Sequence, residues 1–241
     1  LEIEHTIPEA LGFVLDTPAG KMVSFGDFRL DIGKDGTPEQ MDVFARLGTM
    51  GIHTLFLDST NADIQTPSLS ERVIEANLEM LIAQSPGRVV IGIFSSLVDR
   101  ILEIIKIANR LGRKVAVNGR SLKTNLEIAK NLGYSKEEKG VVIPIEEIGK
   151  YHDDKILVLT TGAQGESNAG LMRIVTGEHR LMQLTRTDTV IFSSSVVPGN
   201  ERSVQMLQDN IARQVDEVYN SKLLDIHVSG HGSREDIRDL I

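Results

Sequence analysis

The sequence has no cysteine among its 241 residues. This absence excludes disulfide bonds, thiolate metal ligands and a cysteine nucleophile, so a metal ion would have to be held by histidine and carboxylate side chains. No apolar run approaches the roughly 18 residues that a membrane-spanning helix needs, so no membrane span is expected. Positive charge is also scarce. The net charge of -8 argues against nonspecific binding of nucleic acid by a broadly basic surface. Any phosphate-binding site must therefore be a local one.

Two familiar nucleotide-binding signatures are missing as well. The sequence has neither the Gly-Lys-Ser/Thr of a P-loop nor a Gly-x-Gly-x-x-Gly loop after its first strand. These absences count against an unrelated doubly wound nucleotide-binding domain, an alternative that the apolar pattern alone would permit. Residues 1–5 carry neither an initiator methionine nor a basic segment, and their alternation of apolar and polar residues predicts a start inside a strand, as in a piece cut from a longer protein.

The middle of the chain alternates between short apolar runs and amphipathic stretches. The runs at 88–93 and 114–117 are typical of buried strands, and each is followed by apolar residues at helical spacing and then by a glycine. Further short apolar runs lie at 156–160 and 189–192. Strands that alternate with helices predict an α/β domain in which helices cover a parallel sheet.

The flanking regions predict a mixture of hairpin, helix and strand. Strand-like residues at 10–16 and 21–25 enclose a segment, 17–20, with the composition of a turn. We also expect a short helix around 41–47, a strand at 53–57, a capping box in Ser68-Leu69-Ser70-Glu71, an exposed loop at 136–140, a helical pattern over 200–220 and a strand at 223–228.

Two polar turns after predicted strands, and a third around a histidine, could carry chemistry. Asp58 directly follows an apolar strand, where α/β folds commonly build sites, and Asp27 follows a glycine at the end of another strand. His231 lies between two glycines and two serines, Ser229 and Ser233, whose donors suit an anion such as phosphate. Each also has an ordinary explanation, because aspartate often serves as a turn or cap residue and a single histidine in a polar turn is often only solvated.

Other small-residue loops follow apolar runs and are more ambiguous. Ser96 can present a hydroxyl to a phosphate, although capping of the helix that follows explains it equally well. The loops 161–166 and 193–200 suit close approach of a ligand or of another backbone segment. His227 and His231 are four residues apart, but they lie in a strand and a turn, so a helical pair of metal ligands is not expected.

In this order the motifs resemble the ribonuclease J family, a group of beta-CASP metallo-beta-lactamase nucleases. The resemblance extends over nearly the whole chain, and in combination its motifs are highly specific. The segments that carry it are His5-Thr6-Ile7-Pro8, Thr17-Pro18-Ala19-Gly20, Gly26-Asp27-Phe28-Arg29, Asp58-Ser59-Thr60-Asn61-Ala62, Phe94-Ser95-Ser96, Gly162-Ala163-Gln164-Gly165-Glu166, Ser193-Ser194-Ser195 with Pro198-Gly199-Asn200, and Ser229-Gly230-His231-Gly232-Ser233.

The resemblance implies a role for each matching residue. His5 and Asp27 match two metal ligands, of which the second is a carboxylate that bridges two ions. Asp58 and His231 match catalytic positions, the first in proton transfer and the second against the scissile phosphate. These residue types suit the chemistry because paired cations can activate water and neutralise developing charge, while an imidazole can protonate the departing oxygen. Hydroxyls that hold an RNA phosphate match Ser96, Ser229 and Ser233.

The sequence departs from the family pattern in the metal-binding part. The His-x-His-x-Asp-His signature is absent, and so is a final histidine motif, expected beyond Ile241. Phe25 stands where the family more often has threonine before Gly-Asp, which is a milder change. One imidazole and one bridging carboxylate fall short of the four ligands that each zinc ion takes. Stable metal binding and catalysis are therefore not expected of this chain alone.

The implied fold is α/β, with a beta-CASP domain of parallel sheet and flanking helices inserted in a partial metallo-beta-lactamase αββα fold. The expected boundaries are 1–67 and 225–241 for the metallo-beta-lactamase parts and 68–224 for the beta-CASP domain. The implied function is that of a cytoplasmic, metal-dependent ribonuclease with 5′–3′ exonuclease and endonuclease activity in RNA processing and decay. It would use two divalent ions (zinc, with magnesium or manganese as alternatives), 5′-monophosphorylated RNA and a homodimer or tetramer of the full-length protein. The alternative is a catalytically inactive RNA-binding or assembly module.

Overall fold

The chain folds into two compact units in the computed structural model, which describes residues 1–33, 37–135 and 140–241. Unit 1 contains residues 1–72 and 228–241, and unit 2 contains residues 73–227. Most of the predicted exposed loop at 136–140 lies outside the described residues. The division follows contacts between residues, so the domain boundaries expected from the sequence stay a prediction.

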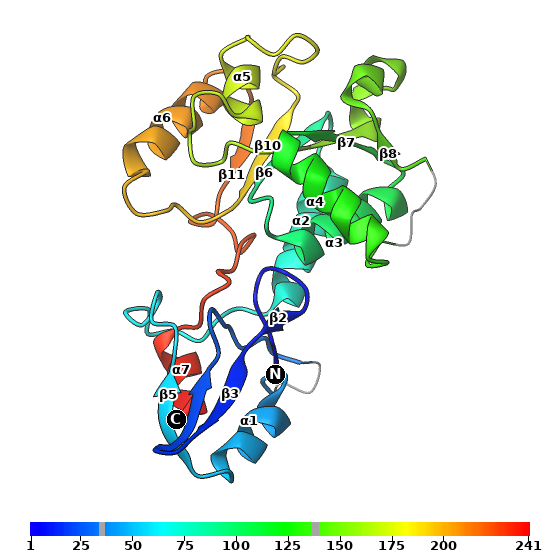
Figure 1. The fold of residues 1–241 in the computed structure, drawn as a ribbon. Helices are drawn as coiled ribbons and strands as arrows, with labels where there is room; N and C mark the ends of the chain where they lie inside the picture. The colour runs from blue at the N-terminus through cyan, green and yellow to red at the C-terminus, as the bar shows by residue number, and fades with distance from the viewer. Residues whose placement is uncertain (34–36, 136–139) are drawn as a thin grey trace. The chain divides into compact units, whose positions relative to one another are not determined.

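Unit 2 is built on a sheet of six parallel strands in the order β11-β10-β6-β9-β7-β8 (Figure 1). Strands β6, β9 and β10 are buried along their whole length, which explains why valine, isoleucine and leucine are so frequent in them. The predicted parallel sheet is thereby confirmed. The strands are β6 (Val89–Ile93), β7 (Lys114–Asn118), β8 (Val142–Ile143), β9 (Ile156–Thr160), β10 (Thr189–Ser193) and β11 (Glu217–Tyr219).

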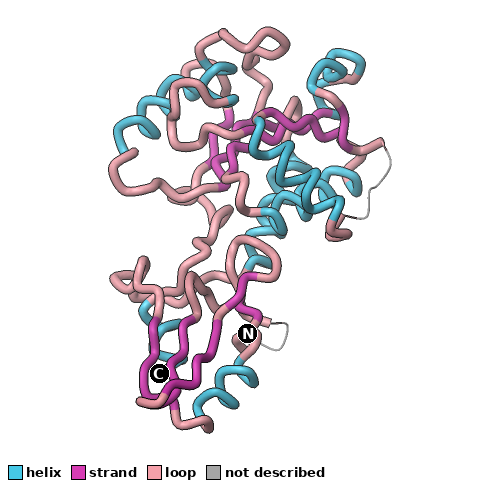
Figure 2. The backbone as a smooth tube through the Cα atoms, in the orientation of Figure 1, coloured by secondary structure: helices cyan, strands magenta, loops and turns pink. Residues whose placement is uncertain are grey.

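Helices pack on both sides of this sheet, as the tube in Figure 2 shows. In the part of the chain that the structure describes, no helix is both long and apolar enough to cross a membrane. The helices are α2 (Glu71–Gln84), α3 (Val98–Arg110), α4 (Arg120–Asn131), α5 (Gly170–Val175) and α6 (Glu201–Ala212), with 3-10 turns η1 (Ile145–Lys150) and η2 (Asp153–Lys155).

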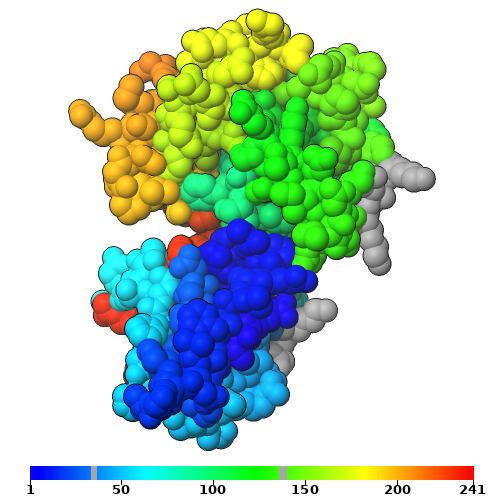
Figure 3. All heavy atoms as spheres, in the orientation of Figure 1, coloured from blue at the N-terminus to red at the C-terminus, as the bar shows by residue number. Residues whose placement is uncertain are grey.

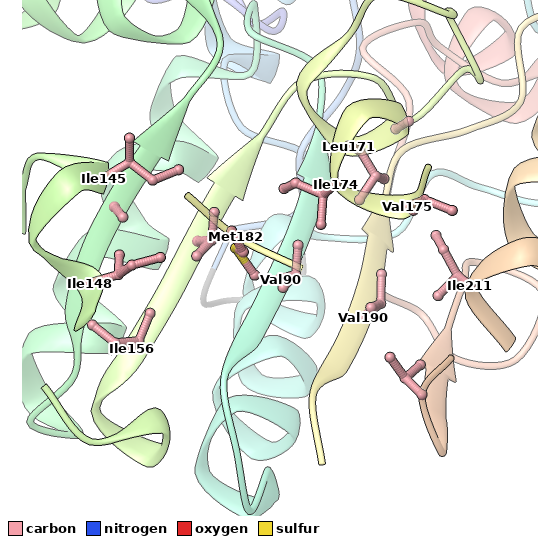
Figure 4. Packing of buried hydrophobic residues seen from close by; sticks show 14 of the residues in the cluster. Val90, Ile145, Ile148, Ile156, Leu171, Ile174, Val175, Met182, Val190 and Ile211 are labelled. Carbon is pink, nitrogen blue, oxygen red and sulfur yellow. The ribbon is translucent and has the colours of Figure 1, made fainter. Parts of the chain in front are cut away.

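One buried cluster joins the sheet to α5, α6 and η1. Val90 and Val190 from neighbouring strands meet Ile174 of α5 and Ile211 of α6, and Ile148 of η1 belongs to the same cluster (Figure 4). Burial of each such side chain contributes about 1.5–3 kcal/mol. This packing fixes the carboxyl ends of the strands, from which the loops of unit 2 leave.

Unit 1 is a three-stranded sheet with short helices. Strands β3 (Phe13–Thr17) and β4 (Gly20–Ser24) form the predicted antiparallel hairpin, and β4 pairs in parallel with β5 (Ile52–Phe56). The parallel pairing requires a crossover, which includes helix α1 (Met41–Gly48). The remaining elements are β1 (Glu2–Ile3) paired with β2 (Ala10–Leu11), and α7 (Arg234–Leu240) near the C-terminus.

The helical pattern over 200–220 was predicted too long. Helix α6 ends at Ala212, and the apolar spacing continues through Val215 in a turn to Val218 in β11. The valines are β-branched and suit extended backbone, so apolar spacing alone could not locate the helix end. The strand predicted at 223–228 is also wrong, because these residues form a turn followed by coil, and the last strand is β11 at Glu217–Tyr219.

The predicted capping box at Ser68 does not form. Helix α2 begins at Glu71, and the Ser68 hydroxyl donates to the carboxylate of Asp236 instead. The capping box that does form lies at α7, where the Ser233 hydroxyl accepts from the Asp236 amide and the Asp236 carboxylate accepts from the Ser233 amide. Serine followed at three residues by an acid is a weak signal when neighbouring segments compete for the same side chains.

One face of the unit 1 sheet carries large apolar side chains that remain exposed. Phe13 and Phe56 stand in one cross-strand row on either side of Ser24, and Leu15 lies on the same face. The exposed fractions are 53%, 53% and 50% for Phe13, Phe56 and Leu15. Figure 3 shows residues 1–25 (blue) covering much of the visible surface of this unit. Apolar patches of this kind promote association or aggregation.

We expect the double variant Phe13→Thr, Phe56→Thr to self-associate less than the parent chain and to enhance the fluorescence of the dye ANS less. Threonine keeps the strand propensity while removing apolar surface, so the free energy of unfolding should change little. Sedimentation velocity measures the association. Val23→Thr is the matched control on the buried face of the same sheet, and it should destabilise the fold instead. Unchanged association of the double variant would contradict the prediction.

Candidate functional site

Two side chains that are 173 residues apart in sequence meet in unit 1. Nδ1 of His231 lies 2.6 Å from Oδ2 of Asp58, within hydrogen-bond distance. The Asp58 side chain is 6% exposed and the His231 side chain 28% exposed, so the carboxylate lies beneath the imidazole. A carboxylate can accept the Nδ1 proton, which fixes the ring and leaves Nε2 for other chemistry.

Thr60 holds the Asp58 carboxylate from the other side. Oδ1 of Asp58 accepts hydrogen bonds from the Thr60 amide at 2.9 Å and from the Thr60 hydroxyl at 2.6 Å. Burial of Asp58 opposes its ionisation, but the bonds from Thr60 and His231 outweigh burial, so the pKa of Asp58 lies below its ordinary value of 3.8. The carboxylate is therefore ionised at neutral pH, and its orientation is fixed at both oxygens.

His5 lies next to this pair. The His5 and His231 rings meet edge to face with centroids 5.4 Å apart. Nδ1 of His5 lies 2.7 Å from the carbonyl oxygen of Gly230, which can only accept, so Nδ1 carries a proton and the neutral ring has its lone pair on Nε2. A Cβ on Gly230 would lie 2.3 Å from a carbon of Thr6 and 2.9 Å from the His5 ring, so only glycine fits there.

Asp27 completes the group on the more exposed side. It follows Gly26, whose φ of 63° is the left-handed conformation that glycine adopts without strain. The Asp27 side chain is 60% exposed, and its Oδ2 lies 3.8 Å from Nε2 of His5. Asp27, Asp58 and His231 also offer ligand atoms that all lie within 4.8 Å of one another.

These distances decide how well a metal ion fits. Two ligands of one zinc ion can be at most about 4.4 Å apart, because each bond is about 2.0–2.2 Å long. Nε2 of His5 and Oδ2 of Asp27, at 3.8 Å, satisfy this limit. Their pairing of an unprotonated nitrogen with a carboxylate oxygen is suited to a cation. Histidine ligands generally donate their other ring N–H to a carbonyl or carboxylate, as His5 does to Gly230.

The three serines singled out from the sequence have different surroundings. Ser229 is partly exposed, and its oxygen accepts from the His231 amide at 3.2 Å, so its own proton remains available to donate. Ser233 is 2% exposed and caps α7, so a phosphate contact from its hydroxyl would require that cap to open. Ser96 belongs to unit 2, in the turn between β6 and α3.

We expect Thr60→Val to raise the pKa of Asp58, because valine keeps the shape and the amide but removes the hydroxyl that stabilises the carboxylate. A depressed pKa contributes stability above the unfolded-state pKa, and that contribution is lost as the pH falls through the folded-state pKa. The variant should therefore lose it at a higher pH. Carboxyl 13C NMR titration measures this pKa. Thr60→Ser, the matched control, should stay close to the parent, and equal values for all three chains would contradict the prediction.

Comparison with known proteins places the chain in a family. The family described as "Ribonuclease J, beta-CASP domain" matches residues 86–211. The chain belongs to the ribonuclease J beta-CASP family. The match covers five of the six strands of the parallel sheet, β6 to β10, and most of α6, while β11 lies beyond it. It confirms both the resemblance and the beta-CASP α/β fold expected from the sequence.

Curated relatives carry the same family name. The chain is 40% identical over 232 residues to "Ribonuclease J 1" of Streptococcus pyogenes, covering 96% of this chain and 41% of the relative. It is 33% identical over 237 residues to "Ribonuclease J" of Mycoplasma pneumoniae, covering 98% and 42%, respectively. With "Ribonuclease J" of Helicobacter pylori the identity is 35%, and the coverage is 98% of this chain and 34% of the relative. The chain thus spans about two fifths or less of these relatives.

A solved structure shares the fold at low sequence identity. A crystal structure titled as a protein of unknown function from Enterococcus faecalis V583 superposes with a TM-score of 0.64 and 15% identity. The superposition covers 100% of this chain and 54% of that one. It shows a shared fold alone.

The ribonuclease J motifs found in the sequence include four residues that the fold gathers in unit 1, namely His5, Asp27, Asp58 and His231. The sequence did not single out two supporting residues. Thr60 holds Asp58, and the Asn61 side chain donates to the carbonyl oxygen of His231 at 3.0 Å. Both lie inside the Asp58-Ser59-Thr60-Asn61 motif, but only coordinates show which groups their side chains reach.

Proposed function

We propose that this chain is part of a metal-dependent ribonuclease that hydrolyses phosphodiester bonds in RNA processing and decay. The observation that carries the proposal is the Asp58–His231 hydrogen bond beside the facing Nε2 of His5 and Oδ2 of Asp27. A carboxylate-oriented imidazole next to a cation-binding pair is suited to hydrolysis of an anionic ester. The ribonuclease J family membership supports RNA as the substrate.

In the proposed reaction, a water oxygen bonds to phosphorus while the bond from phosphorus to the departing sugar oxygen breaks, and the attacking water releases one proton to the solvent. Nε2 of His231 donates a proton to the departing oxygen, and the ring then regains a proton from the solvent. Asp58 stabilises the protonated ring through its bond to Nδ1. The hydroxyls of Ser229, Ser96 and Ser233 would donate to phosphate oxygens of the RNA, and for Ser233 this requires the α7 cap to open. A donor at the reacting phosphate stabilises charge that is greatest in the transition state.

His5 and Asp27 would hold the metal ions. When bound, divalent ions would activate water and neutralise charge on the phosphate. We propose zinc, since imidazole and carboxylate are among its usual ligands, with magnesium or manganese as alternatives. Two protein ligands are fewer than a tetrahedral site takes, so parts of the full-length protein beyond this chain would have to supply the others.

We further propose the finer features that the resemblance to the family implies. These are combined 5′–3′ exonuclease and endonuclease action, preference for a 5′-monophosphate, a dimer or tetramer of the full-length protein and a cytoplasmic location. We also propose metallo-beta-lactamase parts at 1–67 and 225–241 around a beta-CASP domain at 68–224.

The test is an RNA cleavage assay on the full-length protein. We expect divalent-dependent hydrolysis, faster on 5′-monophosphorylated than on 5′-triphosphorylated RNA, and its loss in EDTA. Absence of hydrolysis with zinc, magnesium and manganese would defeat the proposal. Equal rates on both RNAs would defeat only the 5′-end preference.

A second candidate is an RNA-binding or assembly module without catalysis. It is favoured by the shortage of ligands, because the His5–Asp27 contact supplies only two. The 241-residue chain would then bind 5′-monophosphorylated RNA in a salt-sensitive manner without cleaving it. Failure of this chain to bind RNA at any salt concentration would exclude the module.

A further inference from the structure

A hollow of about 160 Å³ lies in unit 2, and its lining contains none of the residues assigned to catalysis. It is formed by the segment after β10, the first turns of α6 and the turn after β11. These elements are neighbours at one side of the sheet (Figure 1). Parallel α/β sheets commonly bind ligands beyond the carboxyl ends of their strands. The volume is below the roughly 300 Å³ at which pockets for drug-sized ligands begin, so it suits one small ring or side chain.

The charges around the hollow cancel. Its lining contains one carboxylate, Glu201, and one ammonium group, Lys222. The Glu201 carboxylate accepts from the Gly199 amide at 3.0 and 3.1 Å, so the start of α6 already has its own anion. The buried side chains of Phe192 and Val204 supply apolar surface. An uncharged group with an apolar body fits this lining better than a phosphate does.

Unused hydrogen-bonding groups face the same space. Ser194 is 5% exposed, and within the described residues its hydroxyl has no hydrogen-bond partner, whereas the Ser193 hydroxyl donates to the carbonyl oxygen of Ile226 at 2.8 Å. Gln205 and Gln208 also line the hollow. The Gln205 amide nitrogen donates to Asp209 and leaves its oxygen open, while the Gln208 oxygen accepts from Asn220 and leaves its nitrogen open.

We propose that this hollow binds one unstacked nucleobase of an RNA chain, and we call it the base pocket (Phe192, Ser194, Val204, Gln205 and Gln208). The proposal rests on the proposed function, since it names a subsite for the same substrate class. A nucleobase combines a flat apolar body with donors and acceptors on its edge, and glutamine side chains can bond such an edge. A base could bond the Ser194 hydroxyl, which belongs to a buried residue and has no hydrogen-bond partner within the described residues.

The test is a 15N NMR titration of the 241-residue chain with AMP, GMP, CMP, UMP and ribose 5-phosphate. We expect at least one nucleotide to shift the amide signals of Ser194, Val204 and Gln208, and ribose 5-phosphate to leave them unchanged. Ser194→Ala should weaken binding by about five- to tenfold, as loss of one hydrogen bond implies, without unfolding the chain. Ser195→Ala, a neighbouring exposed serine that does not line the hollow, should bind as the parent does.

Three results would overturn the base pocket. Equal shifts with ribose 5-phosphate would indicate an anion site, and shifts only with a short glutamine-containing peptide would indicate a protein partner. The absence of shifts with any nucleotide would also overturn it. The outcome is separable from that of the cleavage assay. RNA hydrolysis without nucleotide shifts would defeat the pocket alone, and nucleotide shifts without hydrolysis would defeat only the proposed catalysis.

Discussion

His231→Gln in the full-length protein is expected to lower kcat for RNA cleavage by about 10²–10⁴-fold, the usual contribution of general acid catalysis. The amide of glutamine can still hydrogen-bond Asp58, but it cannot exchange a proton at the position of Nε2. Asp58→Asn should also slow cleavage, because an amide in place of the carboxylate no longer stabilises the ring when it is protonated. Both rates are measured under single-turnover conditions, where product release does not contribute.

Metal content distinguishes catalysis from metal binding by the same histidine. If His231 acts only as an acid, His231→Gln should retain the metal of the parent protein, while Asp27→Asn should lose part of it. His53→Gln is the matched control, because His53 is exposed on β5 of the same unit and, within the described ranges, its ring hydrogen-bonds only the Thr54 side chain. An unchanged cleavage rate in His231→Gln would contradict the role of His231 as the general acid. Loss of metal together with loss of rate would show that His231 is a metal ligand.

The helices and strands of unit 2 could be predicted because each is determined by the apolar pattern of its own segment. Apolar runs such as 88–93 and 156–160 had to be strands buried on both faces, and amphipathic stretches between them had to be helices that cover the sheet. The end of α6 could not be predicted in this way. Val215 packs in the core directly after the helix, so apolar spacing continues although the helix does not.

For the candidate site, the sequence predicted the residue types but not how the side chains meet. The residue types of Asp58 and His231 were evident from their motifs, but no periodicity relates positions 173 residues apart. Their meeting depends on tertiary contacts between two turns, including the bridge of Asn61 with Ser233 and the bond from the Gly232 amide to the Phe28 carbonyl. The sequence also could not predict that Ser233 caps a helix and is buried, because a serine after His-Gly suits a helix cap and a phosphate contact equally.

The largest expected effect on stability is that of Asp188→Ala, which should lower the free energy of unfolding of unit 2 by about 3–5 kcal/mol. Asp188 is fully buried and accepts from Arg88 at 2.9 and 2.7 Å and from the Thr185 amide at 2.8 Å. Burial disfavours the charge on Arg88, but its bonds to Asp188 more than compensate and raise its pKa. The pair joins the residues that precede β6 and β10. The variant would leave the half-buried Arg88 guanidinium at the amino ends of these strands with the Gln183 carbonyl and the more distant Asp153 carboxylate, 3.9 Å away, as its remaining partners.

Urea unfolding followed by circular dichroism measures this effect, with a midpoint shift of about 2 M for a slope of about 2 kcal/mol per M. Asp188→Asn separates charge from shape, because asparagine can still accept from Thr185 but not as an anion, and it should give an intermediate loss. The double variant Arg88→Met, Asp188→Leu removes both charges and should recover much of the stability. If it were as unstable as Asp188→Ala, the loss would arise from packing at the strand ends and not from the stranded charge of Arg88.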